Sequence, residues 1–494
     1  MSPANRRPPS AAENLLFWAL LLLIVWLPLP LGSNRPWSAA LLAAAAGLLL
    51  AVYCTLQIAG RTNRAVHLKE LSLPIALWLA WLSWCALQLL PLPFATVAAW
   101  SPSAAELYRL AFPAEAARLQ WPLSIAPELG RRRLLLSLGF FALYLLVAGL
   151  TRDRQRMLLL AHVLVISGLF QALYGGFMVL SGLEYGFFEP KTAYRGFATG
   201  TFVNRNHLAG YLELCSAVAV GLILADLRVG KSDGWKDMLR NFTAFLFSSK
   251  LRVRVFLAAM VIALILTRSR GGNLAFFFSV TACGFLYVLF RERKFVLRSL
   301  LLFGSLLLVD IYIVGEWYGL EKLVTRIEQT ELSTDVRVQI FQTYPPVIER
   351  YWRTGSGLGS FAQAYAPYQP EALEGYWDHA HNDYAQFLIE AGLPGCLILL
   401  ALVLSTAVHA ARVVLMRDNR LRVGICFAVL MAMLAIAIHS VSDFNLQIPA
   451  NAATLVILMA MAAACSAQSR HRRGARVRKK GVRQEDDAYP VPVT

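Results

Sequence analysis

Histidine, arginine and aspartate side chains gather in four short polar segments that lie between long apolar runs. Segment 201–211 carries one arginine and one histidine, and segment 267–273 carries two arginines. Segment 376–395 holds two histidines and two aspartates, and segment 439–451 holds a histidine and an aspartate. The candidate site residues in these segments are Arg205, His207, Arg268, Arg270, Asp378, His379, His381, Asn382, Asp383, His439 and Asp443.

This set of side chains favours chemistry on an anionic ligand. Arginine offers planar donors that match phosphate oxygens, and preorganised arginines can stabilise a pyrophosphate leaving group in a site without metal. A neutral imidazole accepts a proton near neutral pH, so His381 is a candidate general base or a hydrogen-bonding partner for a reacting hydroxyl. The few carboxylates make a poor magnesium cage.

Other interpretations of the same residues stay open at this point. Asp378, His379, His381 and Asp383 are potential metal ligands, although the segment has no helical i, i+4 histidine pair, and they also suit an ordinary polar interface. Arg268 and Arg270 either face a cavity or partner, or snorkel to lipid phosphates. Asp443 either holds a neighbouring histidine or arginine, or forms an Asx turn or helix cap ahead of Pro449.

The run Gly-Ser-Gly-Leu-Gly at 355–359 imitates a phosphate-binding loop, but no strand precedes it and no βαβ unit surrounds it. We therefore expect no dinucleotide site there.

The elements that position these segments are predicted to be membrane helices. The chain has 494 residues, of which 57% are hydrophobic and 16% charged, and its mean hydropathy is +0.53. This composition excludes a soluble globular protein. We predict an all-α polytopic membrane protein with about 12 transmembrane helices. The apolar runs are 15–32, 37–58, 71–90, 132–150, 157–181, 207–227, 253–267, 272–290, 299–315, 384–409, 423–441 and 449–468.

The distribution of charge predicts the orientation. The formal net charge is +17, and the majority of the 47 basic residues fall on one side if the N-terminus is cytoplasmic. By the positive-inside rule both termini are then cytoplasmic, and loops 91–131 and 316–383 are periplasmic. We predict one transmembrane domain, 1–468, and a basic disordered tail, 469–494, which is attracted to anionic lipid and not to nucleic acid.

The larger loop is expected to contain short amphipathic helices. Ser333-Thr334-Asp335 can cap a helix that carries Val336 and Phe341, and Pro345-Pro346 then restarts a second amphipathic turn. The seven cysteines fall inside or at the ends of apolar runs, so they indicate neither a disulfide framework nor a zinc site.

Four motifs resemble the O-antigen ligase and polymerase superfamily. His381-Asn382, nine residues, Gly392, two residues and Gly395 match the pattern His-(Asn/Ser/Gln)-x9-Gly-xx-(Gly/Thr/Tyr) of O-antigen ligases. Gly-Thr-Phe-x-Asn-x-Asn at 200–206, Ser-Arg-Gly-Gly at 269–272 and His-Ser-xx-Asp-Phe-Asn at 439–445 are similar to the wider superfamily. The resemblance covers roughly residues 130–465.

The resemblance implies a metal-independent, inverting glycosyltransferase of the inner membrane, without a cofactor. It implies transfer of a glycan from undecaprenyl pyrophosphate to an acceptor hydroxyl at the periplasmic face, with Arg270 and Arg337 holding the pyrophosphate and His381 positioning or deprotonating the acceptor. Arg205 departs from the pattern, because a smaller or less basic residue is expected between the two asparagines.

The acceptor is not specified by these motifs. The leading hypothesis is lipid A–core, as in a ligase. The alternatives are a polysaccharide polymerase with a glycan acceptor, a protein O-oligosaccharyltransferase and, outside the enzymes, a lipid-linked glycan flippase or transporter. A flippase needs charged residues through the bilayer midplane, and the one-sided cluster argues against it.

Overall fold

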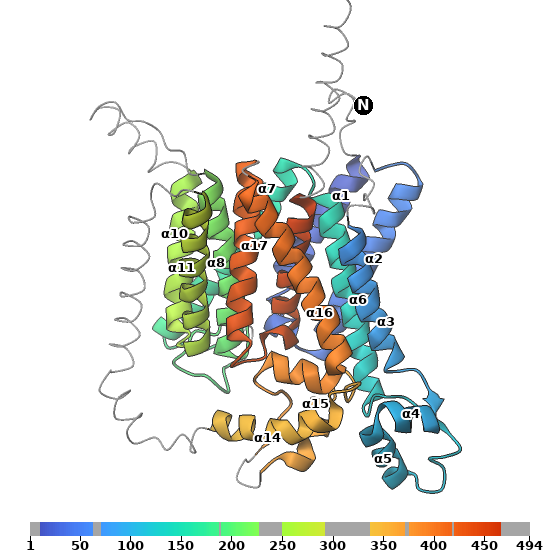
Figure 1. Ribbon diagram of the computed structural model, residues 1–494. Helices are drawn as coiled ribbons and strands as arrows, with labels where there is room; N and C mark the ends of the chain where they lie inside the picture. Colours follow the sequence, from blue (N-terminus) through green and yellow to red (C-terminus); the bar gives the residue numbers. More distant parts are fainter. Residues whose placement is uncertain are drawn as a thin grey trace, which may run out of the picture.

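The computed structural model describes residues 10–62, 71–186, 189–226, 249–291, 336–370, 375–416 and 419–465. The described chain is mostly helical, and its long helices run side by side as one bundle (Figure 1). The long helices are α1 (Ala11–Trp26), α2 (Pro36–Ile58), α3 (Ser72–Leu87), α6 (Pro127–Leu150), α7 (Arg154–Leu180), α8 (Arg205–Asp226), α10 (Ser249–Leu266), α11 (Arg270–Arg291), α16 (Asp383–Leu415), α17 (Arg420–His439) and Pro449–Cys465.

Seven of the described helices are long and apolar enough to cross a membrane, namely α2, α6, α7, α8, α11, α16 and α17. The helices α1, α3 and Pro449–Cys465 are apolar but shorter, and α10 carries Lys250, Arg252 and Arg254 near its start. All but one of the predicted apolar runs fall on described helices, whereas run 299–315 lies outside the described residues. The described residues thus support seven spans, where the sequence predicts about 12.

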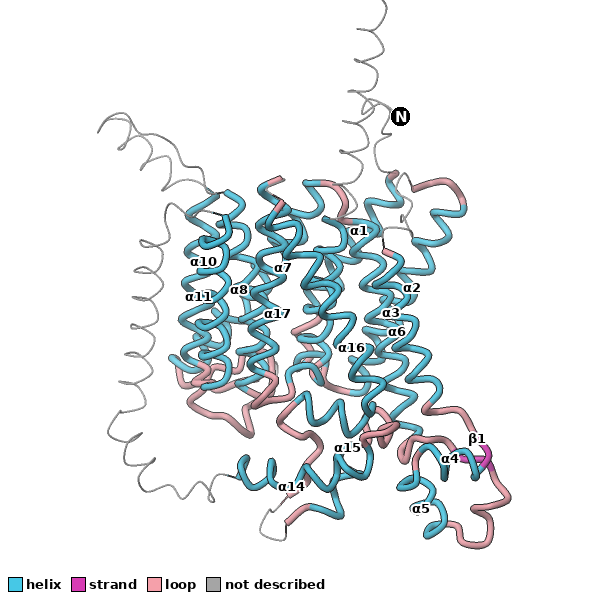
Figure 2. Tube along the Cα trace, viewed as in Figure 1, coloured by secondary structure: helices cyan, strands magenta, loops and turns pink. Residues whose placement is uncertain are grey.

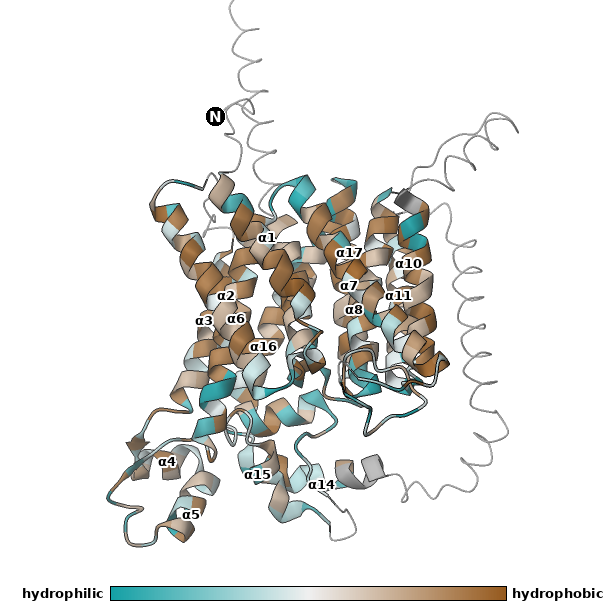
Figure 3. Cartoon of the chain, turned by 180° about the vertical axis from the view of Figure 1, so that it is seen from behind, coloured by the Kyte–Doolittle hydropathy of each residue, from teal (hydrophilic) through white to brown (hydrophobic). Residues whose placement is uncertain are grey.

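The centre of the bundle is formed by α8, α17 and the helix Pro449–Cys465. Within their most apolar windows α8 and α17 are 78% buried, whereas α2 is only 17% buried. A helix that is apolar all round and buried all round belongs to the interior, and one that leaves apolar side chains exposed faces lipid. Gly221 of α8 and Gly424 of α17 allow close approach, since an added Cβ at Gly221 would lie 2.3 Å from the Gly424 carbonyl oxygen. Figure 3 shows the hydrophobic colouring concentrated along the bundle.

Short elements cover one end of the bundle, which we call the site end (Figures 1 and 2). They are α4 (Phe94–Trp100), α5 (Pro102–Ala111), α14 (Val336–Tyr351), α15 (Phe361–Tyr365) and a two-stranded antiparallel pair, β1 (Leu92–Pro93) and β2 (Gln120–Trp121).

Polar contacts join two of these short elements. Arg350 of α14 pairs with Glu106 of α5 at 2.5 Å, and its carbonyl accepts a hydrogen bond from Ser103 at 2.9 Å. The two outer loops predicted from the sequence therefore contact each other.

The helix α14 corrects one detail of the prediction. It runs without a break from Val336 to Tyr351 and contains Pro345 and Pro346, where the sequence indicated a restart. The capping residues 333–335 lie outside the described residues. The apolar side chains of Tyr344 and Val347 pack with α15 in a small core of their own, and this packing offsets the cost of proline inside a helix.

The helix α16 is broken at Gly392, whose φ of 66° and ψ of −178° are not helical. The break leaves backbone groups without partners inside the helix, and the run 355–359 satisfies them. Ser356 N–H donates to the Ile389 carbonyl at 2.8 Å, and Gly357 N–H donates to the Glu390 carbonyl at 3.0 Å. The Glu390 carboxylate in turn accepts from Gly359 N–H at 2.8 Å. The glycine-rich run therefore supplies the hydrogen bonds that the break in α16 leaves unmade, and its N–H groups are used for this purpose.

The first and the last described residues, 10 and 465, both lie at the end of the bundle that is opposite the site end. There Arg156 of α7 pairs with the buried Glu13 of α1 at 2.6 Å, and the Arg156 guanidinium lies 4.9 Å from the Phe17 ring centroid. Cys465 and Asp153, the residue just before α7, line the same small pocket.

Candidate functional site

The four polar segments meet at the site end, because each of them is the start or the end of a long helix. The helix α8 begins at Arg205, α11 begins at Arg270, α16 begins at Asp383 and α17 ends at His439. A loop through Asp443 then leads into the helix Pro449–Cys465. Segments far apart in the sequence therefore lie at the same end of the bundle (Figure 1).

Three histidines surround the ring of Phe444. The His379 ring stacks on it with centroids 4.4 Å apart, and the rings of His207 and His381 meet it edge-on at 4.6 Å and 4.8 Å. Trp377 lies against His381 with ring centroids 5.5 Å apart. Aromatic contacts of this kind fix ring orientation, so Phe444 is the shared support for the three imidazoles.

Asp443 holds His207 and Asn206. Its Oδ1 lies 3.5 Å from His207 Nε2, and its Oδ2 accepts a hydrogen bond from the Asn206 side chain. Burial raises the pKa of this carboxyl, but the close contact with His207 and its charge, the charge of His439 and the Phe444 N–H outweigh burial and hold the pKa well below its usual range. Asp443 is therefore an anion at neutral pH, and the first of its two predicted roles is the one observed.

His379 is buried, and its ring nitrogens lie near Gln386 and Asp378. Its Nδ1 lies 3.0 Å from Gln386 Nε2 and 3.3 Å from Gln386 Oε1. Burial first, and then the positive charge of Arg133, lower the pKa of His379 to about 3 from an ordinary 6.5. The imidazole is thus neutral at physiological pH.

His439 is paired with a residue that the sequence analysis missed. His439 Nδ1 lies 2.7 Å from Oε1 of Glu213, and both side chains are buried. Glu213 is a lone carboxylate inside an apolar run, and such a residue is costly in a membrane helix unless it has a partner. A single carboxylate in the apolar run 207–227 is the sequence feature that could have revealed Glu213.

The glycines of the Ser-Arg-Gly-Gly motif bring α11 against this pair. A Cβ added to Gly271 would lie 2.6 Å from Ser442 Oγ, and one added to Gly272 would lie 3.0 Å from Glu213 Oε1 and 3.1 Å from His439 Cε1. Side chains at these positions would push α11 away, so the glycines fix where the preceding Arg270 stands. Gly271 and Gly272 therefore hold the start of α11 close to Glu213, His439 and Ser442.

His381 and the two residues after it begin α16. His381 has a left-handed φ of 49°, which is uncommon outside glycine and is found at functional sites. Asn382 caps α16, since its Oδ1 accepts from Ala385 N–H at 2.9 Å, and its Nδ2 donates to the Val441 carbonyl at 3.0 Å. The buried Asp383 carboxylate accepts from Ser440 Oγ at 2.7 Å and from Leu446 N–H at 3.0 Å. Asn382 and Asp383 thus join α16 to the loop after α17.

The arginines lie on the outside of the histidine cluster, at the site end of the bundle. Arg268 and Arg270 are exposed, and Arg205 is half-buried with its guanidinium 4.2 Å from the Phe197 ring centroid. The backbone of Arg337 lies in the first turn of α14, and its side chain lies outside the described residues.

Arg133 of α6 is a second residue that the sequence analysis missed. It is half-buried, its guanidinium donates to the Gln447 carbonyl at 3.4 Å, and its charge acts on His379. Nothing in its local sequence, Arg131-Arg132-Arg133, separates it from its exposed neighbours. Only the packing of α6 beside the loop after α17 reveals it.

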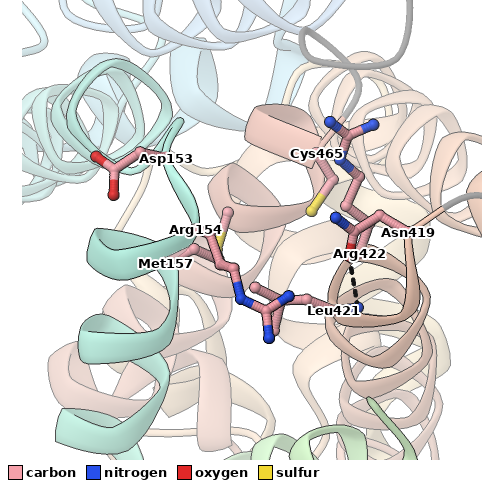
Figure 4. A pocket seen from close by; sticks show the side chains of 7 residues that line it. All are labelled: Asp153, Arg154, Met157, Asn419, Leu421, Arg422 and Cys465. Atoms are coloured by element: carbon pink, nitrogen blue, oxygen red, sulfur yellow. Dashed lines mark hydrogen bonds between the residues drawn. The ribbon is translucent and has the colours of Figure 1, made fainter. Parts of the chain in front are cut away.

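In the described part of the chain, no three histidine, cysteine or acidic side chains group as metal ligands would. The His379 ring contacts the Gln386 side chain, and the Asp383 carboxylate accepts a hydrogen bond from Ser440. A small pocket lies at the opposite end of the bundle, where α7 and α17 begin, and therefore away from this chemistry (Figure 4). Its lining residues are Asp153, Arg154, Met157, Asn419, Leu421, Arg422 and Cys465.

The fold and the site together define a helical protein with seven candidate membrane spans, in which histidines and arginines gather at one end of the bundle. In a comparison with protein families, the family model described as O-antigen ligase matches residues 255–400. This match confirms the resemblance to the O-antigen ligase superfamily and indicates a membrane glycosyltransferase of the ligase or polymerase type. A search of curated proteins returned no match.

The matched range covers part of the candidate site. It runs from α10 through α11 and α14 into α16, so it includes Arg270, Arg337 and His381. Arg205, His207, His439 and Asp443 lie outside it and join the site only through the fold.

Proposed function

We propose that the protein is an inner-membrane glycosyltransferase of the O-antigen ligase type. It transfers a glycan from undecaprenyl pyrophosphate to an acceptor hydroxyl, for which lipid A–core is the leading candidate, at the periplasmic face. The observation that carries this proposal is the cluster of His207, His379 and His381 on Phe444 beside the arginine-bearing start of α11.

The proposed reaction is a single displacement with inversion. The acceptor hydroxyl oxygen attacks the anomeric carbon of the donor, the bond from that carbon to the phosphate oxygen breaks, and undecaprenyl pyrophosphate leaves. His381 takes the hydroxyl proton, or orients the hydroxyl, as the new bond forms. Arg270 and Arg337 stabilise the charge that develops on the leaving pyrophosphate, so no metal is required.

The surroundings of each residue support its role. Arg270 is exposed at the site end. The close packing of Gly271 and Gly272 fixes the position of its backbone. Arg337 lies in the first turn of α14, where the helix dipole favours a bound anion. His381 is oriented by Trp377 and Phe444, and general bases of this kind must be held in a productive direction.

The proposed topology has one transmembrane domain, 1–468, with loops 91–131 and 316–383 in the periplasm and both termini in the cytoplasm. The positive-inside rule counts short loops next to helix ends, and several arginines stand at such helix ends opposite the site. They are Arg152, Arg154, Arg156, Arg412, Arg420 and Arg422.

The decisive experiment is a transfer assay in vitro. Purified full-length protein receives an undecaprenyl-pyrophosphate glycan with or without lipid A–core, and the products are resolved on a gel. A band shift that requires lipid A–core establishes a ligase. A ladder of longer chains from donor alone establishes a polymerase instead, and no product in either lane removes both in favour of protein acceptors or transport.

A further inference from the structure

A partly buried ion pair links two residues within the loop between α7 and α8. Lys191 Nζ lies 2.7 Å from Glu184 Oε2 and donates a second hydrogen bond to the Phe197 carbonyl at 2.9 Å. The other Glu184 oxygen accepts from Gly196 N–H at 2.7 Å. A buried lysine and a carboxylate that both bond to neighbouring backbone groups fix the chain at 196–197.

The same loop is also tied to the helix bundle just beyond this point. Ala198 N–H donates to the carbonyl of Leu266, the last residue of α10, at 3.1 Å. Thr201 N–H donates to Gln171 Oε1 of α7 at 2.9 Å, and Thr201 Oγ1 donates to the Pro28 carbonyl at 2.6 Å. Phe197 is therefore held beside the turn that joins α10 to α11.

Two arginines from different segments lie over the ring of Phe197. The Arg205 Cζ atom is 4.2 Å from the ring centroid and the Arg268 Cζ atom is 5.5 Å from it. The two guanidinium groups consequently lie within roughly 10 Å of each other, although like charges repel. The negative face of an aromatic ring attracts cations, so Phe197 offsets part of this repulsion.

The backbone of Arg268 is strained in a way that fits this arrangement. Its φ of 51° lies in the left-handed region, which an arginine rarely adopts. Strain of this kind persists where the surrounding structure enforces it, and it concentrates at binding sites. Arg268 is the residue that turns the chain from α10 into α11, with its N–H bonded to the Ile265 carbonyl at 2.9 Å.

We propose that Phe197 is a positioning residue that holds Arg205 and Arg268 together as one site for the diphosphate of the lipid-linked donor. The inference rests on the proposed function and adds to it a role for Arg205, the arginine that departs from the family pattern. The Glu184–Lys191 pair and the residues 189–197 act as the frame that keeps the ring in place. A diphosphate is the ligand class that two neighbouring guanidinium groups match best, because each can donate two parallel hydrogen bonds to phosphate oxygens.

The test measures binding of inorganic pyrophosphate to the detergent-solubilised full-length protein, without any transfer. Phe197→Leu keeps an apolar side chain but removes the ring, and we expect it to weaken binding about fivefold. Phe197→Tyr retains the ring and is expected to bind like the unmodified protein. Phe290→Leu, at an exposed ring near the far end of α11, is the matched control.

A combined variant tests whether Phe197 acts through the arginines. Arg205→Gln with Arg268→Gln should weaken pyrophosphate binding more than Phe197→Leu does, and adding Phe197→Leu to that pair should change nothing further. In the transfer reaction, Phe197→Leu should raise the donor KM more than it lowers kcat.

Three results would overturn the inference: unchanged binding by Phe197→Leu, unchanged binding by the arginine pair, or no pyrophosphate binding by the unmodified protein. Each of these leaves the proposed function standing if the transfer assay succeeds. The reverse outcome, with the expected binding pattern and no transfer, keeps the anion site and rejects the proposed function.

Discussion

Nδ1 of His439 lies 2.7 Å from Oε1 of Glu213 in the interior of the bundle, where neither side chain has appreciable access to solvent. The pair joins α8 to α17, and Gly272 of α11 packs directly on both members. One buried contact therefore joins three helices at the base of the site.

Replacing Glu213 should destabilise the protein. Glu213→Ala leaves the His439 imidazole buried without its hydrogen-bond partner. This lowers the free energy of unfolding by about 1–3 kcal/mol. We expect a lower melting temperature in detergent, and a smaller decrease for Glu213→Gln, which can still accept a hydrogen bond. Glu128→Ala removes an exposed carboxylate and serves as control. Equal melting of Glu213→Ala and the unmodified protein would contradict the structural role of the pair.

Removing either arginine that we propose to bind pyrophosphate should abolish transfer. Arg270→Ala and Arg337→Ala each remove a cation from the developing charge, and losing one such donor typically costs about 100-fold to 1,000-fold in kcat. Membrane expression should stay intact, as measured by fluorescence size-exclusion chromatography. Arg412→Ala, in the last turn of α16 at the opposite end, is the control. Near-normal activity in either variant excludes that arginine from the pyrophosphate site.

His381→Ala should lower kcat by roughly 100-fold to 10,000-fold, the usual contribution of a general base. The donor KM should change little, because the donor is held by the arginines. His162→Ala, in the middle of α7, is the matched histidine control. If KM rises while kcat is unchanged, His381 contributes to binding and not to proton transfer.

His379 should make the protein less stable in acid. Its pKa is lowered to about 3 in the folded protein and is about 6.5 when exposed, so the unfolded chain takes up a proton first as the pH falls. Between these two values His379 costs about 1.4 kcal/mol of stability per pH unit. We expect His379→Gln to lose less stability than the unmodified protein between pH 8 and pH 5, measured by thermal melting. Parallel losses in the two proteins would mean that His379 titrates normally.

EDTA should leave transfer unchanged if arginines take the place of a metal ion. The measurement is the rate of product formation before and after dialysis against EDTA. A loss of activity that magnesium restores would support the alternative in which Asp378 and Asp383 bind metal.

The sequence alone determined the class of the protein and most of its helices. The apolar runs predicted α8, α11, α16 and α17 because a membrane span must bury its backbone polar groups in one continuous helix. The family motifs gave Arg270 and His381 as candidate site residues, since the spacing within the motifs is local and can be read without the fold.

Only the tertiary structure decided which residues surround the site. Glu213, Arg133 and Phe444 reach it by long-range packing, and no local pattern indicates their partners. The sequence predicts Asn382 among the substrate-binding residues, and the structure adds that Asn382 caps α16, because a side-chain oxygen at a helix start binds a nearby free N–H group. The glycines at 355–359 looked like a phosphate loop, yet they close around the break at Gly392, which exists only once α16 bends. Local physics sets helices and motifs, whereas the contacts that make a site depend on how distant segments pack.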